Sequence, residues 1–154
     1  MSNVEQKLKE LNMQLPIPTK AVGEYLPYVK SGNLIFLSGH GPAIMEGEKQ
    51  YHGKLGKSLT VDEGYDAARL VGLNLLSTLK MAISDLDRVT HIVKVLGMVN
   101  STPDFNQHPK VINGFSELMS KLYGDKGRHA RSAVGLVNLP FDIPVEIEMI
   151  VEIQ

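Results

Sequence analysis

The sequence contains no cysteine and no tryptophan, and no apolar run approaches the length needed to cross a membrane. Without cysteine, the chain can form no disulfide, no thiolate metal site and no thiol nucleophile. The five histidines are scattered at spacings that match no metal-binding motif, so we expect no metal. The first ten residues, MSNVEQKLKE, are too charged for a signal peptide, and we expect a cytoplasmic protein.

The chain also lacks an excess of charge of either sign. Sixteen basic residues nearly balance seventeen acidic ones, which leaves a net charge of -1. This balance gives no electrostatic reason to expect a polyanionic partner, so nucleic acid is disfavoured. With 154 residues and 43% apolar residues, the chain fits one compact domain with a hydrophobic core.

Most of the chain shows clear secondary-structure patterns. Ser2 can cap a short helix through Asn12, which the prolines at 16 and 18 end. Two short strands, 28–30 and 34–38, flank a tight turn, and 46–57 is predicted to be a polar loop with a short strand near Leu55. A long helix begins at the capping box of Thr60 and Glu63 and runs to about residue 83. A central strand over 91–100 and a helix from 104 or 107 to 123 follow.

The last quarter of the chain carries the clearest strand pattern. Apolar residues at every second position over 145–153 predict a half-buried strand, and a similar alternation precedes it over 131–138. Two prolines and an aspartate in 139–144 suit a turn, so we predict that the chain ends in a hairpin.

Within this hairpin Arg131 is a candidate anion site. If Val134 and Leu136 face the core, Arg131 points to the opposite face, where Ala133 and Gly135 are too small to cover it. A guanidinium is a fixed fork of donors that grips a carboxylate or phosphate through two hydrogen bonds. The alternative, an arginine paired with a strand glutamate, is equally compatible with the pattern.

The order of these elements predicts a mixed sheet with both long helices on one face. The other face would then show residues 133, 135, 137 and 150 among the glutamates of the last strand. Such a surface is too apolar to remain exposed to water, which favours association of the chain with copies of itself.

Several short motifs together resemble the YjgF-like family, also called the reactive intermediate deaminase (Rid) or L-PSP endoribonuclease family. They occur in the family's order from about residue 21 to the end: Ala21-Val22-Gly23-Glu24-Tyr25, Ser38-Gly39-His40, Asp104-Phe105, Ala130-Arg131-Ser132, Leu139-Pro140 and Val145-Glu146-Ile147-Glu148. The resemblance implies a chorismate-mutase-like fold and a homotrimeric barrel with ligand sites between subunits. It makes residues 21–154 a single domain and residues 1–20 an N-terminal helical extension.

The resemblance also implies an activity without metal or cofactor: hydrolysis of reactive enamines and imines to 2-keto acids and ammonia. Arg131 matches the arginine that binds the substrate carboxylate, and Glu146 matches the acid that positions or activates water. Tyr25 matches a tyrosine of the cleft, and Gly39 matches the glycine whose backbone approaches the ligand. Placed water, a carboxylate handle and a proton supply are what such a reaction needs.

Three substrate-site positions depart from the family pattern. Ala133 stands where deaminases often carry cysteine, His40 replaces a common glutamine, and Ile112 falls near an expected asparagine, with Asn113 one position away. These departures indicate a divergent subgroup in which anion binding carries over better than deamination.

Two alternatives therefore stay open beside the deaminase. One is a non-catalytic protein that binds small carboxylates or 2-keto acids in the same clefts. The other is an endoribonuclease that would use His40 or His129 as acid and base. A chorismate mutase is ranked last, because it would need several cations around a dicarboxylate.

The hairpin register places Arg131 and Glu146 far apart within one chain. Arg131 would pair near residues 150–152, which leaves Glu146 about 15 Å away at about 3.3 Å per residue. One small ligand then needs Glu146 from an adjacent subunit, or Glu148 or a water in its place.

Overall fold

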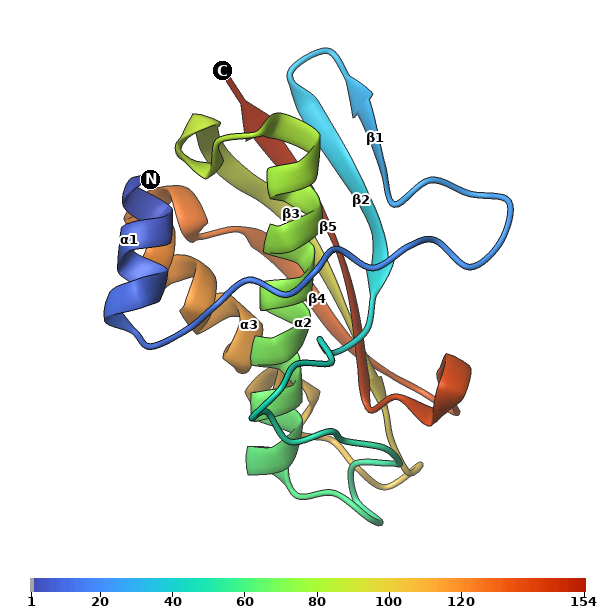
Figure 1. Cartoon of the computed structure of the whole chain (residues 1–154). Helices are drawn as coiled ribbons and strands as arrows, with labels where there is room; N and C mark the ends of the chain where they lie inside the picture. Colours follow the sequence, from blue (N-terminus) through green and yellow to red (C-terminus); the bar gives the residue numbers. More distant parts are fainter. Residues whose placement is uncertain (1) are drawn as a thin grey trace.

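The computed structural model describes residues 2–154 and consists of one mixed sheet covered by helices (Figure 1). The helices are α1 (Asn3–Glu10), α2 (Val61–Ile83) and α3 (His108–Tyr123), with 3₁₀ turns η1 (Leu86–Arg88), η2 (Gly124–Gly127) and η3 (Pro140–Asp142). The strands are β1 (Tyr28–Ser31), β2 (Leu34–His40), β3 (Val89–Asn100), β4 (Ala130–Leu136) and β5 (Val145–Ile153). No helix among residues 2–154 combines the length and apolarity needed to cross a bilayer.

The long helix α2 confirms its predicted start and end. Thr60 accepts a hydrogen bond from the backbone of Glu63, and the Glu63 side chain accepts one from the backbone of Thr60. This reciprocal cap satisfies two of the free donors at the helix N-terminus. The predicted strand near Leu55 is reduced to isolated bridges from Leu55 to Leu59 and Ser101.

The prediction that the chain ends in a hairpin is wrong. The strand order is β1-β2-β5-β3-β4, so β5 inserts between β2 and β3 and pairs antiparallel with both. β4 instead lies parallel to β3 at the edge of the sheet, after the crossover through α3. The physical reason is burial: the five alternate residues of β5 that face the core are at most 4% exposed, which is typical of a central strand.

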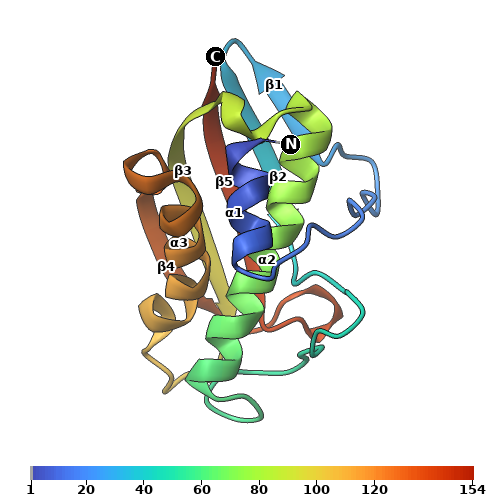
Figure 2. The ribbon, with the colours of Figure 1, turned by 60° about the vertical axis from the view of Figure 1, so that its left-hand side comes forward.

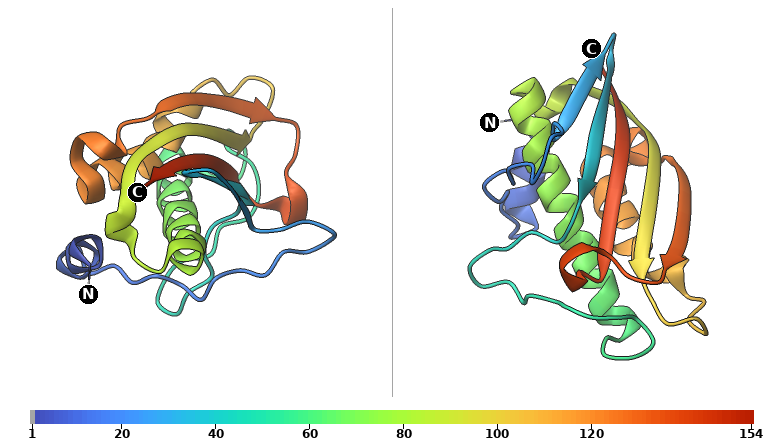
Figure 3. Two further views of the ribbon diagram at one scale, coloured as in Figure 1. Left: turned by 90° about the horizontal axis from the view of Figure 1, so that it is seen from above. Right: turned by 90° about the vertical axis from the view of Figure 1, so that its right-hand side faces the viewer.

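The helices all cover one face of the sheet, and the other face is open (Figures 2 and 3). α2 packs on β2 and β5, whereas α3 packs on β3 and β4. The core fills the space between these layers and includes Phe115, Ile35, Leu70 and Met119. The predicted mixed sheet with both long helices on one face is confirmed.

The predicted orientation of β4 is also wrong. Arg131 pairs with Val95 and Ala133 with Gly97, and both partners face the helices. Arg131, Ala133 and Gly135 therefore lie toward α3, while Val134 and its alternate neighbours lie on the open face. Which residues of this edge strand face the helices could not be predicted from the sequence, because both faces of the strand carry small or apolar residues.

The N-terminal helix α1 packs against the rest of the chain. Ser2 and Glu5 form a capping box, and Val4 and Leu8 are buried in the common core. The carboxylate of Asp87 accepts hydrogen bonds from the backbone N–H groups of Asn3 and Val4, at 2.7 and 3.0 Å. These contacts satisfy helix donors that would otherwise lack partners.

Helices α2 and α3 approach each other closely at Gly114 in α3. A Cβ placed there would lie 1.9 Å from the backbone oxygen of Tyr65 in α2.

We predict that Gly114→Ala lowers the free energy of unfolding by about 1–3 kcal/mol, because overpacking outweighs the higher helix propensity of alanine. Urea denaturation measures this change. Ser120→Ala, at an exposed position of the same helix, is the control and should change stability by less than about 0.5 kcal/mol; equal effects would contradict the close approach.

Candidate functional site

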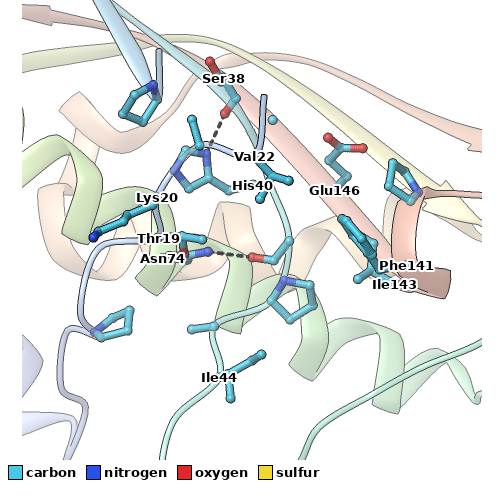
Figure 4. A pocket seen from close by; sticks show the side chains of 18 of the residues that line it. Thr19, Lys20, Val22, Ser38, His40, Ile44, Asn74, Phe141, Ile143 and Glu146 are labelled. Carbon is cyan, nitrogen blue, oxygen red and sulfur yellow. Dashed lines mark hydrogen bonds between the residues drawn. The ribbon is translucent and has the colours of Figure 1, made fainter. Parts of the chain in front are cut away.

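The predicted site residues divide into two groups. Glu146, Gly39, His40 and Tyr25 line one cavity of about 910 Å³, which lies where β2 ends and β5 begins (Figure 4). Arg131 and Ala133 lie on β4, outside that cavity. Sequence reasoning thus grouped four residues that the fold brings together, and added two that a single chain keeps apart.

Gly39 and Glu146 meet because of an irregularity in β2. Leu37 pairs with Met149 and His40 pairs with Ile147, so three steps on β2 oppose two on β5. Such a bulge redirects the backbone. A Cβ on Gly39 would lie 2.3 Å from Oε1 of Glu146, so glycine lets this carboxylate lie against the backbone of β2 in its present position.

The Glu146 carboxylate is only partly solvated and has a like charge nearby. Burial, and secondly the charge of Glu148 on the same strand face, raise the pKa of Glu146 above its ordinary value. No hydrogen bond from residues 2–154 counteracts this shift. A carboxyl group in such surroundings can take up and return a proton more readily near neutral pH than an exposed one.

His40 is a buried structural residue. Its Nδ1 donates to the carbonyl of Ser38 at 2.7 Å, which leaves Nε2 to accept from the hydroxyl of Thr78 at 2.8 Å. Burial lowers the pKa of His40, so the ring is neutral with both nitrogens engaged. Although His40 lines the cavity, it supports the end of β2 and has no free nitrogen for proton transfer.

Polar side chains of α2 hold the cavity walls in place. Asn74 donates from Nδ2 to the carbonyl of Gly41 at 3.1 Å and accepts at Oδ1 from Thr19 at 2.9 Å. Ser77 donates to the carbonyl of Pro16. These bonds tie the segment before β1 and the segment after β2 to the same helix.

Arg131 lies in a separate polar cluster under α3. Its Nη1 donates to Oδ1 of Asn113 at 2.9 Å and to Oγ of Ser116 at 3.1 Å, and Nη2 donates to the carbonyl of Pro109 at 3.4 Å. None of the ion pairs formed within residues 2–154 includes Arg131, so the alternative of a paired glutamate is not what the fold provides. Burial lowers the pKa of Arg131, yet an arginine stays charged.

His129 extends this cluster. Its Nδ1 donates to the carbonyl of Gly127 at 2.7 Å, so its Nε2 accepts from Ser116 at 2.9 Å. Burial is the largest of the causes that lower the pKa of His129. The chain Gly127, His129, Ser116 and Arg131 therefore fixes the direction of each donor and orients the guanidinium.

Sequence reasoning noted Asn113 only as the neighbour of Ile112 and did not connect the residues on α3 with Arg131. Ile112 is fully buried in the core, and Asn113 accepts a hydrogen bond from Arg131. Asn113 and Ser116 are polar residues three positions apart and therefore lie on one face of α3. This pair could have indicated the partners of Arg131, once the crossover through α3 to β4 is recognised.

The two groups face opposite sides of the sheet. Arg131 aligns through Val95 with Met149, whereas Glu146 aligns with Met98 on the open face. Three residues along the strands and two strand spacings separate their backbones by about 14 Å. The predicted wide separation thus holds, although the hairpin register behind it was wrong. No group of three or more His, Cys, Asp or Glu side chains within residues 2–154 could hold a metal ion.

Comparison with known proteins places this architecture in a family. Residues 5–151 match the family described as "YjgF/chorismate mutase-like, putative endoribonuclease". The chain belongs to this family. It is 41% identical over 152 residues to Protein TCP17 of Trypanosoma cruzi, covering 98% of this chain and 94% of that protein.

Solved structures of this YjgF-like fold agree. The protein Atu1372 of Agrobacterium tumefaciens has a TM-score of 0.91 at 39% identity, covering 99% of this chain and 93% of its own. RidA of Psychrobacter sp. PAMC 21119 has a TM-score of 0.56 at 26% identity, covering 89% and 94%. E. coli TdcF with bound serine, at 22% identity and a TM-score of 0.60, shares the fold, with coverage of 92% and 100%. This chain is thus more similar to Atu1372 than to RidA, in both identity and TM-score.

The raised pKa of Glu146 has a consequence for stability. Its pKa is higher in the folded than in the unfolded chain, so the folded state binds more protons, and this group's contribution to stability falls as pH rises through the two values. We predict that Glu146→Gln stabilises the protein more at pH 7 than at pH 4, as measured by urea denaturation at both values.

The matched control for this prediction is Glu152→Gln on the same strand. Its carboxylate already accepts a hydrogen bond from Thr90 at 2.8 Å, so this substitution should bring no comparable gain at neutral pH. An equal or smaller gain for Glu146→Gln than for Glu152→Gln would refute the raised pKa.

Proposed function

We propose that this YjgF-like protein is a cytoplasmic deaminase that hydrolyses small 2-imino acids and their enamines to 2-keto acids and ammonia. The observation that carries the proposal is Arg131, a half-buried and oriented cation without an acidic partner in residues 2–154. A desolvated guanidinium of this kind suits a ligand carboxylate. The relation to RidA and to TdcF with bound serine supports a small ligand of amino-acid type.

We further propose that Arg131 and Glu146 serve one ligand in a cleft between two copies of the chain. Within one chain the two residues face opposite sides of the sheet. The open face carries half-exposed apolar side chains, including Phe36, Val29 and Val134, which favour contact with another copy. Family resemblance favours a homotrimer for this assembly.

In the proposed reaction, Arg131 holds the carboxylate and Glu146 takes a proton from water as its oxygen adds to the imine carbon. The electron pair of the C=N bond moves to nitrogen, which receives a proton from the Glu146 carboxyl group. The resulting carbinolamine then collapses: Glu146 takes the hydroxyl proton and returns a proton to the amino nitrogen, C=O forms, the C–N bond breaks and ammonia leaves. The burial that raises the pKa of Glu146 thus supports the reaction, because a carboxyl group with a raised pKa exchanges protons more readily near neutral pH.

An endoribonuclease, the function in the family's description, has less support. His40 and His129 have both ring nitrogens engaged by protein groups. They lie at the end of β2 and just before β4, two strands that β5 and β3 separate. The net charge of -1 also provides no attraction for RNA. A binding protein without turnover remains the second candidate, favoured by Ala133 in place of the family cysteine.

A turnover assay tests the proposal. Release of 2-keto acid from freshly generated 2-aminoacrylate can be followed by coupling to lactate dehydrogenase, with and without the protein. We predict faster release with wild type and no acceleration with Glu146→Gln. Binding of 2-ketobutyrate without any acceleration would favour the non-catalytic binding protein.

Calorimetry with 2-ketobutyrate tests the carboxylate site separately. We predict that Arg131→Ala weakens binding by about 2 kcal/mol or more, roughly thirtyfold, because the ligand loses a charge-assisted pair. Arg131→Lys should not restore affinity, since an ammonium group lacks the fork of donors. Lys110→Ala, an exposed cation on α3 bonded only to Gln107, is the control and should bind normally. Equal affinity of wild type and Arg131→Ala would rule out this site.

A further inference from the structure

The cavity beside Glu146 is larger than the proposed reaction requires. A three-carbon ligand such as 2-aminoacrylate would fill a small part of about 910 Å³, a size at which pockets hold drug-sized ligands. Beyond the charged residues Glu146, Glu148 and Lys20 the wall is mainly apolar and includes Phe141, Ile143 and Ile44 (Figure 4). This apolar part has no role in holding a carboxylate or placing a water.

Phe141 is the most unusual residue of this wall. Its side chain is 77% exposed, and its backbone has φ 59°, followed by Asp142 with φ 57°. Bulky residues rarely adopt this left-handed conformation. An exposed aromatic ring held in an unfavourable backbone conformation at a cavity indicates a functional constraint.

A buried amide fixes the conformation of this turn. Asn100, fully buried at the end of β3, donates to Oδ1 of Asp142 at 3.3 Å and to the carbonyl of Ile143 at 3.2 Å. Its Oδ1 accepts from Lys54 at 2.6 Å, and Lys54 also donates to the carbonyl of Val137. Both ends of the 137–143 segment are therefore attached to one point, and Phe141 is held beside Glu146.

Prolines make the remaining wall stiff. Four of the eight prolines line this cavity: Pro16, Pro27, Pro42 and Pro140. Each fixes its own φ, so the wall loses little freedom when a ligand binds. A stiff apolar wall next to a carboxylate matches a ligand with one reactive polar end and one apolar end.

We propose that Phe141 forms one wall of a subsite for the apolar side chain of the substrate, so that the protein prefers 2-imino and 2-keto acids with branched or aromatic side chains to three-carbon ones. The proposal rests on the function proposed above and specifies its substrate class. Phe141 acts as a specificity residue, and Asn100 as the residue that positions it.

Calorimetry with four 2-keto acids tests this subsite: pyruvate, 2-ketobutyrate, 4-methyl-2-oxopentanoate and phenylpyruvate. Wild type should bind the two larger acids at least about tenfold more tightly than pyruvate, because each buried apolar carbon adds affinity. Phe141→Ala should lose this preference while its affinity for pyruvate stays the same. Phe141→Asn, which suits the left-handed backbone, should behave alike, and this separates loss of the ring from distortion of the turn.

Val137→Ala is the matched control. Val137 lies in the same segment and is 84% exposed, but it does not line the cavity, so this variant should keep the wild-type preference. Wild type that binds pyruvate as tightly as phenylpyruvate would overturn the subsite alone. A preference retained in both Phe141 variants, with an altered subunit number by light scattering, would assign Phe141 to a subunit contact and overturn its role. If wild type bound none of the four acids, the carboxylate site itself would be refuted.

Discussion

The position of β5 between β2 and β3 is the constraint on which the rest of the structure depends. Its pairing with both neighbours satisfies its backbone on each side and sets the register of the sheet. One side of β5 packs into the core under α2, and the other side carries Glu146 and Glu148. The bulge in β2 then places Gly39 over Glu146. A shift of register by one residue would bury these glutamates and expose the core.

Two charged groups are held in surroundings that do not favour them. Glu146 sits near Glu148 without a hydrogen bond that stabilises its charge, and Arg131 sits under α3 without an acidic partner within residues 2–154. Each arrangement lowers the stability of the isolated chain. The two groups complement each other, since Arg131 provides a cation and Glu146 provides a proton acceptor. A ligand with a carboxylate and an imine carbon would use both.

Local patterns in the sequence predicted local structure well. The capping box at Thr60 and the alternation over 145–153 depend on near neighbours, and both elements are present as predicted. The family motifs also led to Gly39 and Glu146, which the fold brings together. These features could be predicted because short-range spacing or a recognisable motif determines them.

Features that depend on distant partners could not be predicted in the same way. The predicted hairpin was wrong because nothing in residues 137–144 reveals that β5 pairs with β2 and β3 instead of β4. The predicted orientation of β4 was wrong because Ala133 and Val134 fit either side of a strand. Phe141 has no signal in the sequence, since the hydrogen bonds of Asn100 that hold its turn come from another strand.

The central claim is that Arg131 of one copy and Glu146 of another complete one site, and mixing of subunits tests it most directly. Arg131→Ala and Glu146→Gln subunits, each inactive alone, are exchanged in equal amounts, and exchange is confirmed by mass spectrometry. If the two residues come from different chains, about one quarter of the sites should combine intact partners and recover activity. Mixed assemblies that form but recover no 2-keto acid release would contradict the shared site.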